Sequence, residues 1–295
     1  MNCIYVKARA KINLALDVLG KRPDGYHNLQ MIMQSLSLCD DIFIKKTKAP
    51  GVKLVSNNPL LPVNQENLAY QAAARLIEEF NIQHGIYIYL NKVIPVGAGL
   101  AGGSTNCAAT LVALRKLLRL PITDTTLLEM GREFGADVPY CLMRGTAFAE
   151  GTGERLTRLQ KHPDVTVLLA KPGVNISTKQ VFSQYNPNNV TKRPNIPAML
   201  KCIKNSDLKG IAKGFCNVLE SVTISNYPEV SKIKEIMLEL NALGAVMSGS
   251  GPTVFGYFDS KESARLALCC LTKEMPNLKE VFLTTVFNPN IREER

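Results

Sequence analysis

The chain has 295 residues, of which 46% are hydrophobic and 20% charged, so it is long enough for one large or two moderate domains and too apolar for a disordered or fibrous protein. Its 35 lysines and arginines outnumber the 25 aspartates and glutamates, and the formal charge of +10 favours anionic partners: phosphates, nucleic acid or an anionic surface. No stretch approaches the roughly 18 consecutive apolar residues of a membrane-spanning helix, so we expect no membrane insertion.

Strands and helices alternate in the first half of the chain. β-branched residues and period-two alternation predict strands at residues 4–6, 12–16, 42–44, 52–55 and 85–90. Apolar residues at helical spacing predict helices at residues 66–80, 104–119 and 124–134. Between the first strands, Pro-Asp-Gly at 23–25 predicts a turn, because proline presets φ and glycine accepts a positive φ.

A glycine-rich stretch at residues 145–153 predicts a domain boundary, with one domain over residues 1–153 and a second over 154–295. In the second half the same patterns predict strands at 165–170 and 253–258, helices at 230–243 and 260–271, and an Asn/Pro-rich loop at 185–197. The alternation of strands and helices along the whole chain indicates an α+β or α/β fold.

The cysteines and histidines argue against disulfides and metal-binding clusters. The eight cysteines are dispersed without a CxxC pair, which is typical of small buried side chains in a reducing cytoplasm. None of the three histidines lies near a cysteine, so we expect no His/Cys metal site. The basic N-terminus superficially resembles a signal peptide, but Asn13 and Asp17 interrupt its apolar segment and indicate mature structure. We therefore expect a cytoplasmic protein.

A glycine loop at residues 95–104 follows a predicted strand and opens a predicted helix. Its glycines let backbone amides approach an anion, and the helix N-terminus adds unpaired amides and a positive dipole end. The alternative is a simple turn with a helix cap, and Ser104 could either cap the helix or face a phosphate-bound Mg²⁺. No acidic residue stands where a dinucleotide site needs one, and Gly103 and Ser104 replace the Walker A lysine. We predict phosphate binding by the backbone, with any catalytic lysine supplied from elsewhere.

Three other features are candidates for chemistry. A second glycine loop, Ser-Gly-Ser-Gly at 248–251, is either a turn or the acceptor side of a phosphoryl-transfer site. Asp137 follows a helix end, where it is either a cap for the next element or a general base. Lys11 lies among alternating apolar residues, where it is either a solvated strand lysine or the cation that phosphoryl transfer requires.

Segments 10–14, 95–104 and 248–253 together resemble the three motifs of the GHMP kinase superfamily, which includes galactose, homoserine and mevalonate kinases. Segments 22–27, 135–139, 149–154 and 171–174 are most similar to the branch that acts on 4-diphosphocytidyl-2-C-methyl-D-erythritol in the non-mevalonate isoprenoid pathway. The resemblance implies transfer of the ATP γ-phosphoryl group to the 2-hydroxyl of that acceptor. It also implies an α+β fold with an N-terminal ATP-binding domain, a C-terminal ferredoxin-like domain, and the site in the cleft.

The resemblance also assigns roles to residues. Asp137 would be the base with Lys11 beside it, and Asn13 would lie near the acceptor. Cytosine would stack between Tyr26 and Phe182, with His27 on its polar edge, and Thr178 would complete the acceptor site. Mg²⁺ is expected with ATP, and Ser104 is one candidate ligand. The sequence departs from the pattern of the superfamily at Ala101, which replaces a common glycine, and at Asn106, which replaces a commonly acidic residue. The expected ATP-binding residues are Pro95, Gly97, Gly99, Leu100, Ala101, Gly102, Gly103, Ser104 and Thr105, with Asn67 and Leu68 at the adenine; the second loop contributes Ser248, Gly249, Ser250 and Gly251.

Two alternatives remain at this stage. Another small-molecule kinase of the superfamily, of the homoserine or mevalonate type, would leave the aromatic residues at 26, 27 and 182 without a base to stack. A non-catalytic protein that binds a nucleotide or nucleic acid would suit the positive charge, but the basic residues are dispersed with few interleaved aromatics, so we expect no nucleic-acid partner. The sequence is compatible with a monomer or a homodimer.

Overall fold

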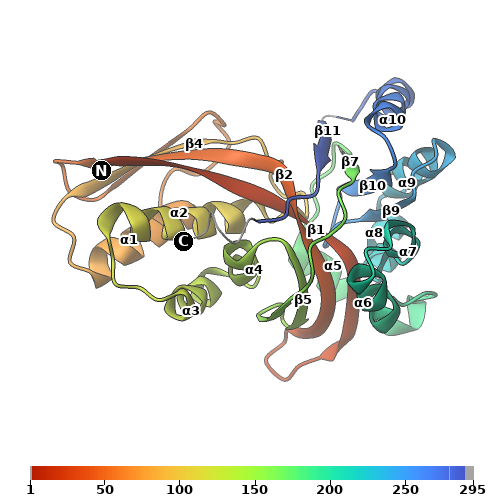
Figure 1. The fold of residues 1–295 in the computed structure, drawn as a ribbon, viewed down its shortest axis with the longest axis horizontal. Coiled ribbons are helices and arrows are strands. Elements are labelled where there is room, and N and C mark those ends of the chain that lie inside the picture. The colour runs from red at the N-terminus through yellow and green to blue at the C-terminus, as the bar shows by residue number, and fades with distance from the viewer. Residues whose placement is uncertain (1, 279, 290–295) are drawn as a thin grey trace. The chain divides into compact units, whose positions relative to one another are not determined.

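The structure is a computed structural model that describes residues 2–278 and 280–289 (Figure 1). Its internal contacts divide the chain into two compact units, each assembled from distant segments. Unit 1 consists of Met1–Ala10, Leu38–Val96 and Ala101–Met143, and unit 2 of Lys11–Ser37, Gly97–Leu100 and Arg144–Arg295. These units follow spatial contacts rather than chain order, so the boundary between residues 153 and 154 stays a prediction. Residues 1, 279 and 290–295 of the two predicted domains lie outside the described chain.

The first two strands are long and contribute residues to both units. β1 (Cys3–Lys21) contains both strands predicted at 4–6 and 12–16, and β2 (His27–Thr47) contains the one predicted at 42–44. The turn predicted at 23–25 lies between them. From Ala10 to Val18 every residue of β1 is buried. The sequence divided one strand into two because residues 7–11, between the predicted strands, are lysine, arginine and alanine, which lack the large apolar or β-branched side chains typical of strands.

In unit 1 a group of helices packs beside a small sheet. β4 (Gly85–Asn91) lies between β3 (Val52–Ser56), which is parallel to it, and the Asp41–Thr47 part of β2, which is antiparallel. Figure 1 shows α1 and α2 side by side along these strands. The helices of this unit are α1 (Leu68–Glu79), α2 (Gly102–Leu118), α3 (Asp124–Phe134) and α4 (Val138–Met143).

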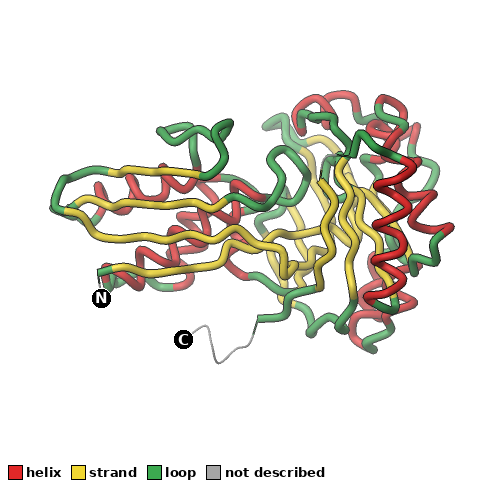
Figure 2. The backbone as a smooth tube through the Cα atoms, turned by 90° about the horizontal axis from the view of Figure 1, so that it is seen from above, coloured by secondary structure: helices red, strands yellow, loops and turns green. Residues whose placement is uncertain are grey.

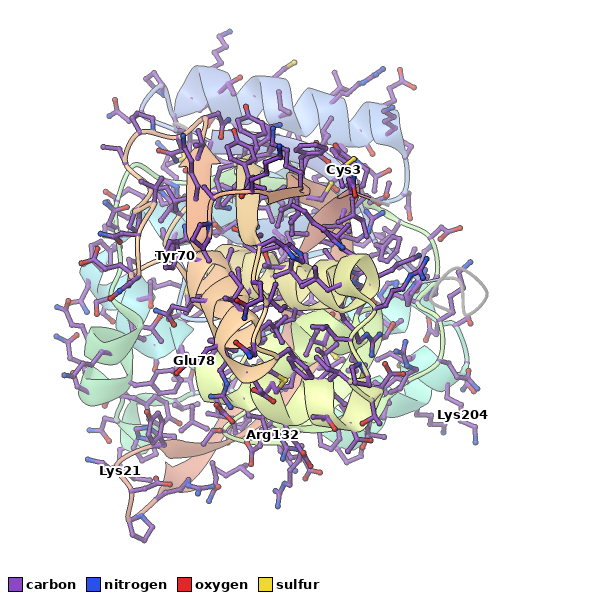
Figure 3. All side chains as sticks on the ribbon, turned by 90° about the vertical axis from the view of Figure 1, so that its left-hand side faces the viewer. Cys3, Lys21, Tyr70, Glu78, Arg132 and Lys204 are labelled. Carbon is purple, nitrogen blue, oxygen red and sulfur yellow. The ribbon has the colours of Figure 1, made fainter. Side chains whose placement is uncertain are left out.

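Ion pairs on the outer surface of unit 1 connect its helices. Figure 3 labels Glu78 on α1 and Arg132 on α3 on this side of the molecule. Arg75 of α1 pairs with Glu79 of the same helix at 2.8 Å and with Glu133 of α3 at 3.0 Å, and the second pair joins the two helices. Such exposed pairs contribute little to stability, so the packing of the apolar helix faces holds α1 and α3 in place.

Unit 2 contains the ferredoxin-like arrangement that the sequence predicts. Its antiparallel sheet has the strand order β11-β7-β10-β9, and Figure 2 shows helices layered against one face of this part. Helices α9 and α10 pack on the sheet, and their positions between strands give the order β-α-β-β-α-β along the chain. The elements are β7 (Thr166–Lys171), α9 (Glu229–Glu239), β9 (Gly244–Met247), β10 (Val254–Phe258), α10 (Lys261–Glu274) and β11 (Glu280–Thr285).

The rest of unit 2 surrounds its parts of β1 and β2. β8 (Cys216–Asn217) pairs with β1 in parallel, and β5 pairs with β2 and β6 in antiparallel fashion. The helices of this region connect β7 to α9. The further elements are β5 (Thr146–Gly151), β6 (Arg155–Arg158), α5 (Thr178–Gln184), η1 (Pro187–Asn189), α6 (Ile196–Lys204), α7 (Leu208–Lys213) and α8 (Glu220–Asn226).

Two predicted elements of the second half differ from the structure. The loop predicted at 185–197 contains η1 and the start of α6, because Asn195 caps α6 by accepting from the amide of Ala198, and Pro197 suits the first helical turn. The helix predicted at 230–243 ends at Glu239, since Asn241 has a left-handed φ of 65° that terminates it. Asparagine and proline thus indicate helix ends here as well as loops. Within the described residues, no helix has the length and apolar character that crossing a membrane requires.

Candidate phosphoryl-transfer site

The start of α2 exposes backbone amides to a ligand. Its N-cap residue, Ala101, is in the left-handed conformation, with φ 56°, and no side chain of the described residues caps the helix. The amides of the first turn lack partners within a helix by geometry, and Gly103 in that turn is exposed. This arrangement suits a phosphate group. Ser104 lies inside the first turn, so the alternative that it caps the helix is wrong.

The Gly97–Leu100 part of the first loop belongs to unit 2 and bends through two left-handed glycines. Gly97 has φ +63°, and a Cβ added there would meet no atom of the described chain within 4 Å. Gly99 has φ +73°, and a Cβ there would overlap the carbonyl oxygen of Ser248. The loop therefore combines one open glycine with one glycine that close packing requires.

The three sequence motifs meet within unit 2. The carbonyl of Leu100 accepts from the amide of Lys11 at 3.1 Å. The Ser248 hydroxyl donates to the carbonyl of Gly99 at 2.9 Å and accepts from the amide of Asn13 at 3.3 Å. A small set of hydrogen bonds thus joins β1, the first glycine loop and the second glycine loop.

Lys11 is a buried lysine rather than a solvated one, because it is only 4% exposed. Its Nζ donates to Asn13 Oδ1 at 2.8 Å, which places both side chains on the same face of β1. Asn13 is fully buried, and its Nδ2 contacts the sulfur of Met31 at 3.3 Å. Burial and this bond hold the ammonium group in one position, which a charge-stabilising role requires.

The second glycine loop is held by side chains of unit 2. Asn217 donates through Nδ2 to the carbonyls of Met247 and Gly249, at 2.8 and 2.7 Å. The hydroxyls of Thr178 and Ser250 lie 2.8 Å apart, so a predicted acceptor residue contacts this loop directly. Asn217 could not be predicted from the sequence, because its strand has only two residues and carries no motif.

An aromatic group of unit 2 contains two of the three predicted cytosine residues. The rings of His27 and Phe182 stack with centroids 5.3 Å apart, and the edge of Tyr185 meets His27 at 6.3 Å. Tyr26 is separate from this stack, and 67% of its surface is exposed. Burial, and more weakly the charge of Lys21, lower the pKa of His27, so it is neutral near pH 7.

An ion pair between Arg193 and Asp17 supports this aromatic group. Arg193 donates to Asp17 Oδ1 at 2.6 Å and to the carbonyl of Val18 at 3.1 Å, and it lies 3.4 Å from the hydroxyl of Tyr185. Arg193 comes from the stretch predicted as a loop, and Asp17 from β1. No motif links two residues so distant in the sequence, so only the folded chain could reveal the pair.

The predicted adenine and catalytic residues of unit 1 are placed as follows. Asn67 caps α1, accepting from the amide of Ala69 at 2.9 Å and donating to the carbonyl of Pro62 at 2.8 Å. Leu68 begins α1 and lies 3.7 Å from the Cβ position of Gly103, next to the first loop. Asp137 is half-buried directly before α4, and its carbonyl accepts from the amide of Cys141 at 3.0 Å.

No group of three or more His, Cys, Asp or Glu side chains in the described part of the chain is arranged to hold a metal ion. A magnesium ion that arrives with a nucleotide needs fewer protein ligands, because it keeps several waters and binds the phosphates. The hydroxyl of Ser104, at the uncapped start of α2, suits such a site.

Comparison with known protein families identifies the class. Residues 67–145 match the GHMP kinases N terminal domain, and residues 199–277 match the GHMP kinases C terminal domain. The chain belongs to the GHMP kinases. This confirms the family and the α+β fold expected from the three motifs, and membership of a kinase family carries ATP as the phosphoryl donor.

Individual relatives identify the branch. The 4-diphosphocytidyl-2-C-methyl-D-erythritol kinase of Caldicellulosiruptor bescii is 46% identical over 95% of this chain and 97% of its own. The enzyme of the same name from Lachnoclostridium phytofermentans is 47% identical over 97% and 98%. A crystal structure of 4-(cytidine 5'-diphospho)-2C-methyl-D-erythritol kinase is 31% identical, covers 97% of this chain and 100% of its own, and superposes with a TM-score of 0.83. The chain therefore stands in the branch of the family that its motifs predicted.

A more distant solved structure shares the fold alone. Homoserine kinase from Cytophaga hutchinsonii is 21% identical and superposes with a TM-score of 0.78 over 97% of this chain and 95% of its own. The fold thus serves several acceptors, and the acceptor must be argued from the site residues.

Proposed function

We propose that the protein transfers the γ-phosphoryl group of ATP to the 2-hydroxyl of 4-diphosphocytidyl-2-C-methyl-D-erythritol, giving the 2-phosphate and ADP, in the non-mevalonate route to isoprenoids. The names of the relatives in the same branch support this acceptor. The observation that carries the proposal is the junction of Lys11, Gly99 and Ser248 within unit 2, which joins three motifs at one place.

We propose that the first glycine loop binds the ATP phosphates and that Asn67 and Leu68 lie near adenine. The uncapped first turn of α2 and the open position at Gly97 support the phosphate site. Bound Mg²⁺ would neutralise phosphate charge during the transfer, and the Ser104 hydroxyl is its proposed protein ligand. The remaining proposed contacts of the loop are Pro95, Gly99, Leu100, Ala101, Gly102, Gly103 and Thr105.

We propose Asp137 as the general base and Lys11 as the cation of the reaction. A tertiary alcohol is a weak nucleophile, so a carboxylate must accept its proton as the new O–P bond forms. The ammonium of Lys11 would stabilise the negative charge of the transferred group as the bond to ADP breaks. Its burial and its bond to Asn13 support this role, because a fixed charge requires no reorganisation during the reaction.

For the acceptor we propose that cytosine lies against Tyr26 and Phe182, with His27 at its polar edge. The exposed ring of Tyr26 is available for stacking, and Phe182 already contacts His27. A neutral His27 has one nitrogen that donates and one that accepts, which lets it discriminate among bases. Asn13 and Thr178 complete the proposed acceptor contacts, and the Ser248–Gly251 loop supports them through the bond between Thr178 and Ser250.

Three wider expectations belong to this proposal. We propose domains over residues 1–153 and 154–295, a cytoplasmic location, and a monomer or homodimer without nucleic-acid partners. All eight cysteines lie in the described part of the chain, where they are free thiols.

Replacing the proposed base tests the mechanism. Asp137→Asn should keep the fold and lower kcat by roughly 10²- to 10⁴-fold, because the amide cannot accept the proton. The measurement is steady-state turnover, with unfolding followed by circular dichroism. Asp259→Asn, a substitution at an exposed aspartate, is the matched control and should leave kcat unchanged. Near wild-type turnover of Asp137→Asn would remove Asp137 from the mechanism.

A further inference from the structure

A buried polar cluster of unit 1 lies beside the start of α2, and the proposed mechanism does not use it. It consists of Asp40 on β2, Lys92 just after β4, and Asn106 on α2, and we call it the Asp40 cluster. The side chains of Asp40 and Lys92 are 0% and 3% exposed. Two opposite charges removed this fully from water persist only where their hydrogen bonds are well satisfied.

The carboxylate of Asp40 accepts hydrogen bonds at both oxygens. Oδ2 accepts from Lys92 Nζ at 2.7 Å and from Asn106 Nδ2 at 2.8 Å. Oδ1 accepts from the backbone amides of Val93 and Ile94, each at 2.7 Å. The four donors leave this carboxylate well satisfied, and they come from both sides of the glycine loop in the sequence.

Lys92 makes a further hydrogen bond within the same cluster. Besides Asp40, its Nζ donates to the carbonyl of Ile94 at 2.6 Å. A Cβ added to Gly102, the first residue of α2, would lie 2.9 Å from this Nζ. The ammonium group of Lys92 therefore lies directly beside the start of α2, and the absence of a side chain at Gly102 leaves space for it.

Together these contacts fix the two stretches that flank the loop. Residues 92–94 lead into it, and Gly102 and Asn106 lie in the first turns of α2 that follow it. A shift of α2 along its axis would break the bond between Asn106 and Asp40, and a shift of residues 92–94 would break the two amide bonds. The amides at the start of α2 are thereby held in one place before a ligand arrives.

We propose that the Asp40 cluster positions the ATP phosphates by fixing the start of α2, with Asn106 as its positioning residue on that helix. The inference rests on the proposed function only in taking ATP as the ligand of the loop. The amide nitrogen of Asn106 donates to Asp40 at 2.8 Å, whereas a carboxylate at this position would repel Asp40. Asparagine at this position therefore serves the cluster.

The test is removal of the Asn106 amide. Asn106→Ala should raise KM for ATP, and Kd for a non-hydrolysable ATP analogue, by about tenfold, because small misplacement of a binding group is costly. KM for the acceptor should stay within about twofold, since the cluster does not act on that substrate. Asn106→Ser, a milder change whose hydroxyl cannot span the gap to Asp40, should shift ATP affinity in the same direction and serves if the alanine variant does not fold.

Thr110→Val is the matched control, because Thr110 is equally buried on the same helix and donates to the carbonyl of Asn106 at 2.8 Å without touching Asp40. It should lower thermal stability without changing ATP affinity. Equal ATP affinity in the wild type, Asn106→Ala and Asn106→Ser would overturn the positioning role and leave a purely structural one. Calorimetric binding of the ATP analogue separates this result from a failure of the proposed function. A wild type that binds the analogue yet phosphorylates no acceptor would contradict the proposed function. In that case the ratio of the Kd values of variant and wild type would still decide the role of the Asp40 cluster.

Discussion

The two glycine loops look alike in the sequence but differ in what surrounds their glycines. In the first loop, Gly97 faces open space and Gly103 is exposed at the uncapped start of a helix. In the second loop, a Cβ on Gly251 would overlap the sulfur of Met247, and one on Gly249 would lie 3.3 Å from the carbonyl oxygen of Gly99. Gly249 and Gly251 of the second loop are therefore closely packed, whereas the first loop combines the closely packed Gly99 with an open position at Gly97 that could admit a ligand.

This difference gives the second loop a supporting part. Ser248 bonds the carbonyl of Gly99 and thereby holds the bend of the first loop. Asn217 in turn bonds the carbonyls on both sides of Ser248. A glycine-rich stretch can thus contribute by packing against the loop that is proposed to bind phosphate, and substitutions can separate the packing role of one loop from the binding role of the other.

The largest effect is expected where the loops touch. Gly99→Ala places a methyl group onto the carbonyl oxygen of Ser248 and requires a left-handed φ of +73°. Strain and overpacking together should lower the free energy of unfolding by about 2–6 kcal/mol. Urea denaturation measures this loss. A Gly99→Ala variant as stable as the wild type would show that the contact between the loops does not constrain the bend.

Gly97→Ala is the matched substitution in the same loop. It should separate the effect of blocking a ligand at the loop from the effect of disturbing the packing between the two loops. The alanine pays backbone strain of about 1–3 kcal/mol for its φ of +63°, but its methyl group meets no neighbouring atom of the described chain. Because the methyl occupies space proposed for phosphate, ATP affinity should fall by about tenfold, equivalent to ~1.4 kcal/mol. Titration with an ATP analogue measures this change. Unaltered ATP affinity would mean that phosphate does not approach Gly97.

Tyr26→Ala tests a surface that belongs to neither loop. The lost ring should weaken acceptor binding by about 1–3 kcal/mol, the usual contribution of one stacked base, and leave KM for ATP unchanged. Steady-state kinetics with each substrate varied in turn distinguishes an effect on acceptor binding from an effect on ATP binding. If KM for ATP rose while KM for the acceptor stayed constant, Tyr26 would not belong to the cytosine site.

The smallest effect concerns a histidine that lies in no proposed site. His162 is buried, its Nδ1 lies 2.7 Å from the carbonyl oxygen of Pro163, and its Nε2 lies 3.3 Å from the hydroxyl of Tyr257. Burial lowers its pKa below the ordinary 6.5, which the bond to Pro163 only partly offsets. The folded state thus binds a proton less readily than the unfolded chain, so the contribution of His162 to stability is complete above pH 6.5 and is lost as the pH falls through the lowered pKa.

The free energy of unfolding, measured in urea between about pH 7.5 and about pH 5.5, should therefore fall slightly towards acid. His162→Gln cannot titrate and should reduce this slope, whereas ATP affinity should not change in either protein. An identical slope in the variant would assign the acid sensitivity to other groups.

Local patterns predicted much of this molecule. The helix at residues 124–134 has the predicted bounds, because a capping threonine and a glycine mark its ends. The motifs around Lys11, Gly99 and Ser248 predicted the family, and the structure joins them by hydrogen bonds. These features depend on residues close together in the chain or on motifs with distinctive spacing.

Contacts between distant residues without a motif could not be predicted. Asp40 and Lys92 are 52 positions apart, and each resembles an ordinary surface charge until β2 and β4 bring them together. The pair of Asp17 and Arg193 spans 176 positions. Burial and pairing of such charges depend on the assembled sheet, and no local period or propensity reports them.

The measurement that tests the central claim most directly is phosphoryl transfer from Mg-ATP to a panel of acceptors: 4-diphosphocytidyl-2-C-methyl-D-erythritol, mevalonate, homoserine and galactose. Our account predicts turnover with the first acceptor alone, because only that acceptor has a base for Tyr26, His27 and Phe182. Turnover with another acceptor would contradict the cytosine site, and ATP binding without any transfer would contradict the assignment of Lys11 and Asp137 to catalysis.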